Sequence, residues 1–370
     1  MPTGLQRTLI SGLLLCICAG QAYADKLDDN LQTVWESLWD QRGTPRQLLR
    51  WDKTISYRIH GPDSSRHREH IQSALKAATE VAQLDIIDVS AQVDAESTAT
   101  LDIEIVNDSS LQDNEPCFTA PLKWSNWAYD KVQVKMRSKD TWRCTFHEIM
   151  HVMGIAGHPS GKTVLSYFPY RRDTLMELDR LMLAAWYAPA MPKGATPLDA
   201  LSVLSAAVAK QTDLDVPVAE VVKRTNAFNQ RMVLQLQSMA TGEGEIPTIV
   251  MRSGKASQDF ITRSQPIAAY FVGLAYLKGV IVSKDAPAST PWFERAAKKG
   301  HSPSQVMLAR ALRSGLGTDI NLLAAHAWLT AAAKSGNTIA RTELDALEKI
   351  MSPQELEQVQ VQPLPQAASV

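Results

Sequence analysis

The chain has 370 residues, 45% of them hydrophobic, with 38 Lys and Arg balanced by 39 Asp and Glu. A chain of this length can bury more than one hydrophobic core, so we expect two or three domains. The near-neutral charge lacks the basic stripe that binds a phosphate backbone, which argues against nucleic acid as a partner.

Residues 1–24 have the parts of a secretory signal peptide. Arg7 precedes an apolar run from Leu9 to Ala19, and a small-x-small cleavage site, Ala-Tyr-Ala, follows at 22–24. The apolar run is too short to stay as a membrane anchor. We therefore expect an exported protein without an anchor after cleavage, in the periplasm of a Gram-negative-type bacterium or secreted from it.

Residues 25–49 are predicted to be an N-terminal helical lead-in. Apolar side chains recur in it at helical spacing, which indicates one buried helix face. These residues are Leu31, Val34, Trp35, Leu38 and Trp39.

Residues 50–190 show the pattern of an α/β domain. Residues 55–59 alternate like a strand and 65–83 form a helix. Further strands are predicted at 86–89, 98–106 and 132–136, before another helix. Alternation of strands and helices is typical of α/β folds.

The helix after the last strand carries the pattern His147-Glu148-x-x-His151. Residues four apart lie on one face of a helix, so His147 and His151 can bind one metal ion with Glu148 beside them. Imidazole pairs suit Zn²⁺, and a carboxylate next to the metal can activate a bound water. The pattern predicts one Zn²⁺ ion with Glu148 as general base; the alternative is a chance polar stripe on an ordinary helix.

With Gly154 and His158, which follow this helix, residues 50–190 resemble the metzincin clan of zinc peptidases. The resemblance implies an α/β (α+β) domain with a mixed sheet and a zinc helix. It implies that Gly154 turns the chain at positive φ and that His158 is the third ligand. It also implies a polypeptide substrate that pairs with the edge of the strand at 132–136; the alternative is a strand without substrate contact.

The chain departs from the metzincin pattern at the third ligand. The clan places this histidine three residues after the glycine, whereas His158 lies four after Gly154. The loop must therefore bulge by one residue, which Gly157 permits because it has no side chain to clash. The alternative is that His158 is only a polar loop residue.

A second departure lies in the turn expected beneath the metal, at residues 164–167. Leu165 stands where the clan has methionine, and leucine can supply the same apolar floor. The resemblance implies that Tyr167 donates a hydrogen bond to the oxyanion during catalysis. The alternative is a tyrosine that only packs in the turn.

Glu177 is a rival third ligand, because other zinc peptidases take a glutamate from a downstream helix. The spacing of Thr174 and Glu177 is also that of a capping box, with Thr174 as N-cap. We favour the capping role.

Two cysteines, Cys117 and Cys144, remain after signal cleavage. Export places them in an oxidising compartment, so we expect one disulfide that braces the start of the zinc helix. Two buried free thiols are the alternative.

Residues 191–264 are predicted to be a helical bridge without visible chemistry, and residues 265–360 repeat. Gly279 recurs as Gly315 and Trp292 as Trp328, each 36 residues later. The repeated unit of two helices resembles Sel1-like, tetratricopeptide-type repeats, which implies an all-α domain. Such repeats generally bind a protein partner, although two units can also merely pack on the peptidase domain. The tail at 361–370 is predicted to be disordered.

Two functions fit these features. The first is an exported zinc endopeptidase with a protein-interaction repeat module. The second is a noncatalytic envelope scaffold whose zinc site is structural or degenerate. An intact Glu148 favours the first, because a purely structural site does not need it.

Overall fold

The computed structural model describes residues 26–40, 43–107, 109–112, 115–166, 173–211, 217–244, 250 and 258–361. They form two compact units, one within Met1–Gln41 and Arg46–Phe228, the other within Arg42–Pro45 and Asn229–Val370. The predicted signal peptide at 1–24, Tyr167, and residues 362–370 of the predicted tail lie outside the described residues. No helix in the described part of the chain combines the length and the apolar character that crossing a bilayer requires.

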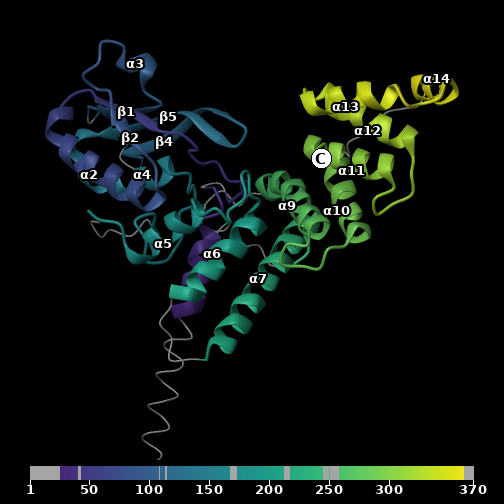
Figure 1. The fold of residues 1–370 in the computed structure, drawn as a ribbon, viewed down its shortest axis with the longest axis horizontal. Coiled ribbons are helices and arrows are strands. Elements are labelled where there is room, and N and C mark those ends of the chain that lie inside the picture. Colours follow the sequence, from purple (N-terminus) through teal and green to yellow (C-terminus); the bar gives the residue numbers. More distant parts are fainter. Residues whose placement is uncertain are drawn as a thin grey trace, which may run out of the picture. The chain divides into compact units, whose positions relative to one another are not determined.

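The first unit (Figure 1) is built on a five-stranded mixed sheet. Its strands lie in the order β2-β1-β3-β5-β4. The first four strands of this order are parallel, and β4 is antiparallel to β5. The mixed sheet expected for this part of the chain is confirmed. The strands are β1 Ile55–His60, β2 Ile86–Asp88, β3 Leu101–Val106, β4 Cys117–Ser125 and β5 Ala128–Arg137.

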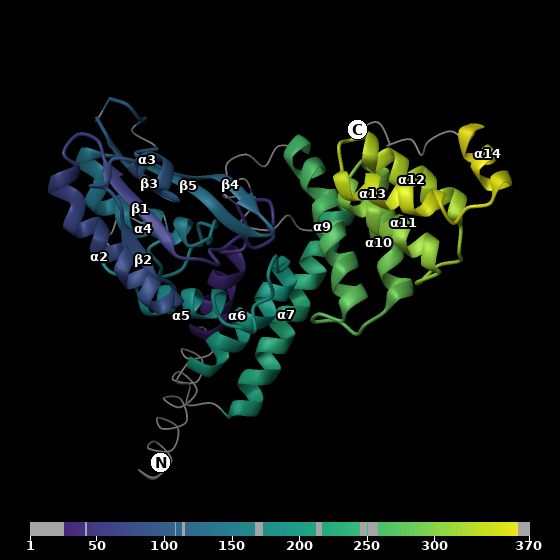
Figure 2. The same cartoon turned by 45° about the horizontal axis from the view of Figure 1, so that its top comes forward.

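One face of the sheet is covered by α2 (Ser64–Ala82) and α4 (Thr141–Val152), which lie side by side (Figure 2). Alternate residues of β1 and β5, such as Tyr57 and Met136, are buried because side chains alternate across a strand. The other face carries charged neighbours such as Glu104 and Lys135, which form an ion pair of 2.9 Å. The helices that carry the site therefore rest on the apolar face.

One of the two edge strands of the sheet is β4, which the sequence pattern does not reveal. Pro121 and a run of exposed residues interrupt the alternation there, and proline is typical of edge strands. The prediction that the strand at 132–136 offers its edge to a substrate is wrong, because β5 lies between β3 and β4. The free edge next to α4 belongs to β4.

The first unit contains further helices besides α2 and α4. The lead-in predicted as helical over 25–49 is helical only over residues 26–36, where Leu31, Val34 and Trp35 are each 0% exposed. Leu38 and Trp39, predicted on the same helix, are buried but follow its end. The other helices are α3 Ala95–Thr98, the short 3₁₀ helix Ser138–Asp140, α5 Glu177–Trp186, α6 Pro197–Gln211 and the first part of α7 Val218–Thr241.

The predicted capping box of α5 is displaced. Met176, rather than Thr174, is the N-cap, and the Asp179 carboxylate, rather than Glu177, accepts the N-cap N–H at 2.9 Å. Both pairs have the same spacing in sequence. Asp179 takes the capping role because its side chain is fully buried and also accepts hydrogen bonds from the loop at 163–164.

The second unit consists of helices packed in sequence, each against the next, from α9 to α13. Left-handed glycines end α9 and α11, with φ of 79° at Gly279 and 72° at Gly315, as the repeated glycines predicted. A Cβ at Gly273 would lie 2.7 Å from the Phe293 ring, so close helix packing needs glycine there. The helices are α9 Gln258–Lys278, α10 Ala286–Lys298, α11 Ser302–Ser314, α12 Leu322–Lys334, α13 Thr338–Glu348 and α14 Pro353–Val361.

Candidate metal centre

Helix α4 supplies two of the three clustered histidines and the neighbouring carboxylate. It ends at Val152, and Gly154 then turns the chain with φ of 100°. A Cβ at Gly154 would lie 2.1 Å from the Leu49 carbonyl oxygen, so a side chain cannot be placed there. The turn predicted at this glycine is confirmed.

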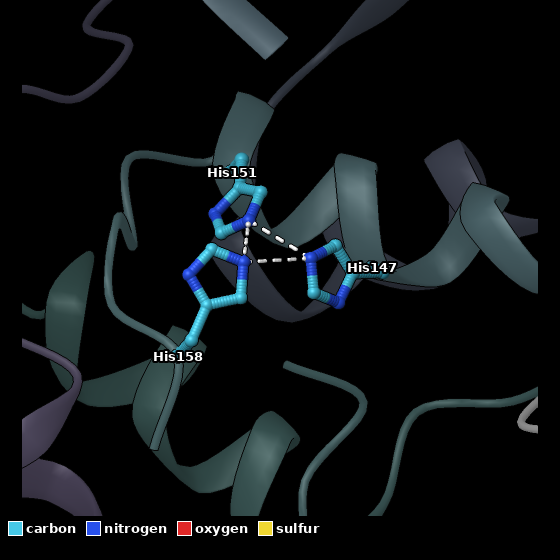
Figure 3. A group of neighbouring side chains, drawn as sticks. All are labelled: His147, His151 and His158. Carbon is cyan, nitrogen blue, oxygen red and sulfur yellow. Dashed lines mark hydrogen bonds between the residues drawn. The ribbon is translucent and has the colours of Figure 1, made fainter. Parts of the chain in front are cut away.

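The loop after this turn brings His158 back to His147 and His151. Their Nε2 atoms are separated by 3.0 Å (147 to 158), 3.1 Å (147 to 151) and 3.2 Å (151 to 158). Figure 3 shows the three rings directed at one another, with two of them on the same helix. The one-residue bulge of the loop therefore does not keep His158 from the other two rings.

The hydrogen bonds of two rings fix which nitrogen carries the proton. His147 Nδ1 lies 2.9 Å from the Val164 carbonyl oxygen, and His151 Nδ1 lies 2.7 Å from that of Ile155. A carbonyl only accepts, so each Nδ1 is the donor, and in the neutral ring each Nε2 is left as a lone pair. These two lone pairs point towards each other and towards His158. A cation between the three rings would be attracted to them.

The spacing of the three nitrogens fits zinc. Nitrogens held tetrahedrally at the usual zinc distance lie about 3.3 Å apart. The observed separations of 3.0 to 3.2 Å are close to this value. Backbone carbonyl partners on Nδ1 are the kind of support that ligating histidines commonly have.

Burial keeps the cluster in its ligating, uncharged form. Desolvation, with the neighbouring His147 second, lowers the pKa of His151 to about 3. Desolvation also lowers the pKa of His147 and of His158, and the two neighbouring rings add to this effect at His158. Neutral imidazole is the form that binds a metal ion.

The side chain of Glu148, on α4, lies between this helix and the edge strand β4 and is 2% exposed. Its Oε2 accepts a hydrogen bond from the Thr119 hydroxyl of β4 at 2.7 Å. Burial raises the pKa of Glu148 to about 7, with the Thr119 hydrogen bond acting in the opposite direction. A cation beside this carboxylate would favour its charged form.

The predicted disulfide between Cys117 and Cys144 is confirmed. Cys117 begins β4, two residues before Thr119, and Cys144 lies one helical turn before Glu148. The bond therefore joins the two elements that meet at the carboxylate of Glu148.

Asp179 of α5 is a supporting residue that the sequence analysis missed. It is 0% exposed, and its carboxylate accepts hydrogen bonds from the Thr163 hydroxyl and from the Val164 N–H, the latter at 3.2 Å. The carbonyl of the same Val164 orients His147. A carboxylate in the first turn of a helix looks in sequence like any capping residue, so only the fold separates the two roles.

The other predicted site residues lie as follows. Leu165 is fully buried in the turn after Val164, and Tyr167 is outside the described residues. Glu177 is exposed at the first residue of α5. Among the described residues, the group of side chains placed to hold a metal consists of His147, His151 and His158, without Glu177.

Comparison with known proteins locates a family in the second unit. The Sel1 repeat family model matches residues 266–301 and 302–337. Two solved structures are similar. One is a Sel1 repeat protein from Oxalobacter formigenes, with 22% identity over 32% of this chain and 45% of that chain, at a TM-score of 0.23.

The other is a protective antigen of uropathogenic Escherichia coli with an SLR fold, with 21% identity over 49% of this chain and 44% of that chain, at a TM-score of 0.26. The chain thus spans less than half the length of either structure. No curated protein matches. Residues 266–337 are therefore two Sel1 repeats, as the 36-residue period predicted.

Proposed function

We propose that the protein is an exported, zinc-dependent endopeptidase of the metzincin type, joined to a Sel1 repeat module that binds a protein partner. The observation that carries the proposal is the convergence of three imidazole Nε2 atoms within 3.2 Å, one residue from a buried carboxylate. A purely structural zinc site has no use for Glu148.

The proposed roles follow from the positions of the side chains. His147, His151 and His158 would hold Zn²⁺, which when bound lowers the pKa of a bound water and polarises a peptide carbonyl. Glu148 would take the proton of the attacking water and pass it to the leaving amine. Thr119, by donating to Glu148 Oε2, would hold the carboxylate in one orientation.

The substrate would be an extended polypeptide paired with the free edge of β4. A strand edge offers backbone N–H and carbonyl groups to such a chain. The carboxylate of Glu148 is hydrogen-bonded to Thr119 of this same strand, so a chain paired with this strand would lie close to the proposed general base. Tyr167 keeps its predicted role, a hydrogen bond to the oxyanion, as part of this proposal.

The second candidate is a noncatalytic envelope scaffold that works through its repeats. The Sel1 match favours it, since such repeats generally mediate protein–protein contacts. The match to the family model does not reach the histidine cluster, so the comparisons taken alone favour the scaffold. The buried, hydrogen-bonded Glu148 is the reason to place the peptidase first.

Replacing Glu148 separates the two candidates. The mature protein is incubated with a pool of denatured proteins, and new N-termini are identified by mass spectrometry. Glu148→Gln keeps the side-chain shape and the metal ligands, so we expect zinc content to stay and turnover to fall by about 100-fold or more. Glu177→Gln, an exposed glutamate in the same unit, is the control and should keep both. A zinc-loaded wild type that cleaves nothing would support the scaffold.

A further inference from the structure

The third histidine is the one member of the cluster outside α4, so its position depends on what holds its loop. His147 and His151 are fixed by the helix itself. His158 follows the turn at Gly154 and is reached through residues 155–157, which lie in no helix or strand. Whatever element holds this loop therefore sets the geometry of the cluster.

A buried carboxylate of the N-terminal lead-in binds this loop directly. Glu36 is 0% exposed, and its Oε2 accepts the Ser160 N–H at 2.8 Å and the Ser160 hydroxyl at 3.1 Å. Its Oε1 accepts from Gln32 Nε2 at 3.0 Å. Hydrogen bonds to a carboxylate are about twice as strong as those between neutral groups. Glu36 thus ties down the loop two residues after His158.

The backbone on the other side of His158 is fitted to the same segment. The Gly157 N–H donates to the Ser37 carbonyl at 3.2 Å. A Cβ at Gly157 would lie 2.4 Å from the Glu36 carbonyl oxygen, and one at Gly161 would lie 1.9 Å from Thr33 Oγ1. The loop approaches the lead-in so closely on both sides of His158 that only glycine fits at these two positions.

The lead-in is itself firmly anchored in the first unit. Its apolar face is completely buried, and the rings of Trp35 and Trp39 pack edge to face with centroids 5.5 Å apart. A little further on, Leu49 supplies the carbonyl against which Gly154 turns. The segment is therefore a well-packed surface, and the turn at Gly154 and the loop of His158 both pack against it.

We propose that the lead-in is a working part of the metal centre and that Glu36 is a positioning residue for zinc, acting through Ser160 and the loop of His158. This inference rests on the proposed zinc binding. The loop of His158 is one residue longer than the corresponding loop in the metzincin clan. Its proposed support, Glu36, lies outside residues 50–190, the region that resembles the clan. Glu36 does not touch the metal, so its effect should appear in metal affinity and geometry.

The test measures Zn²⁺ affinity of the mature protein by competition with a chromophoric chelator. Glu36→Gln keeps the size of the side chain but removes the charge that binds Ser160. We expect zinc binding about 10- to 100-fold weaker, the usual effect of losing an outer support of a metal ligand. Asp40→Asn, which removes an acid from an exposed ion pair with Arg46 in the same segment, is the matched control and should bind zinc like the wild type.

A second variant and a second readout separate positioning from folding. Ser160→Ala removes only the hydroxyl contact of an exposed residue, so we expect the protein to fold normally. Zinc should bind to this variant about two- to fivefold more weakly. Co²⁺ absorption spectra report ligand geometry, and the Glu36→Gln spectrum should lose the intensity typical of tetrahedral sites.

The outcomes distinguish this inference from the proposed function. Wild type without zinc affinity would overturn both. Wild type that binds zinc, together with Glu36→Gln and Ser160→Ala proteins of unchanged affinity and unchanged Co²⁺ spectrum, would overturn the role of Glu36 alone.

Discussion

The proton on each α4 histidine is placed by a backbone carbonyl, and this detail decides what the cluster can bind. With Nδ1 of His147 and His151 donating to Val164 and Ile155, both Nε2 atoms can only accept. Burial disfavours the protonated rings. A cation would stabilise such a group of uncharged acceptors, so the arrangement suits a metal ion.

Asp179 should influence the metal through His147. Asp179→Asn weakens the carboxylate contacts to Thr163 and Val164, and the Val164 carbonyl that orients His147 then loses its support. We expect Zn²⁺ affinity to fall by about 10-fold or more. Titration against a chelator measures it, with Asp173→Asn, an exposed acid nearby, as the control. Equal affinities of the two variants would contradict the role of Asp179.

The sequence predicts the histidines well and their supports poorly. His147 and His151 are visible because helical spacing alone brings them together. Asp179, Thr119 and Glu36 come from distant parts of the chain, and nothing in their local sequence shows which loop or strand they meet. His158 is partly predictable. The glycines around it indicate a loop, but they do not show that the lead-in holds this loop in place.

At the scale of elements, α4 and the edge strand β4 are joined by the disulfide and by the hydrogen bond from Thr119 to Glu148. β4 itself escapes prediction because its pairing with β5 is set by contacts across the sheet, while Pro121 and a run of exposed residues that includes Leu122 and Trp124 hide the alternation. Strands β1, β3 and β5 are easier to predict, since each has a buried apolar face.

Removing the disulfide should loosen this junction. Cys117 and Cys144 are 27 residues apart, and closing such a loop reduces the entropy of the unfolded chain by an amount worth roughly 3 to 4 kcal/mol. The double variant Cys117→Ser, Cys144→Ser should lose about this much unfolding free energy in urea titrations. Reductant should lower the stability of the wild type and leave the variant unchanged; a response of both, or of neither, would contradict the bracing role.

The start of α11 should be sensitive to acid. Burial lowers the pKa of His301, the N-cap residue of α11, to about 4. The free imidazole titrates near pH 6.5, so the unfolded chain binds more protons and stability is lost as pH falls from about 6.5 towards 4. At pH 5 the loss is about 1 to 2 kcal/mol.

His301→Asn is the matched variant for this prediction, because asparagine is a good N-cap and does not titrate. Hydrogen exchange of the α11 amides at pH 7 and pH 5, corrected for intrinsic rates, measures the opening free energy. The difference between the two pH values should shrink in the variant. A full difference retained in His301→Asn would assign the acid sensitivity to another group.

At the scale of the whole molecule, the chain divides into a unit with a candidate catalytic centre and a unit with two Sel1 repeats. The repeats are predictable because their period, glycine stops and alanine positions are local and occur twice. The sheet order and the role of the lead-in cannot be predicted in this way, since both depend on contacts between segments far apart in sequence.

Zinc should stabilise the first unit specifically. A ligand that binds only the folded state adds about 4 kcal/mol of stability at a thousand times its dissociation constant. Zinc should therefore slow hydrogen exchange in α4 and in residues 155–161, while exchange in α10 and α12 stays unchanged. Equal protection of both units, or none in α4, would contradict a zinc site formed by these histidines.

Metal analysis of the purified mature protein beside the His158→Ala variant tests the zinc site itself. We expect one zinc per chain in the wild type, with three imidazole ligands seen by X-ray absorption. In the variant we expect zinc affinity to be weakened by more than about 100-fold, a larger effect than losing an outer support. A wild type without zinc, or a variant that binds zinc equally well, would show that these three histidines do not form the metal site.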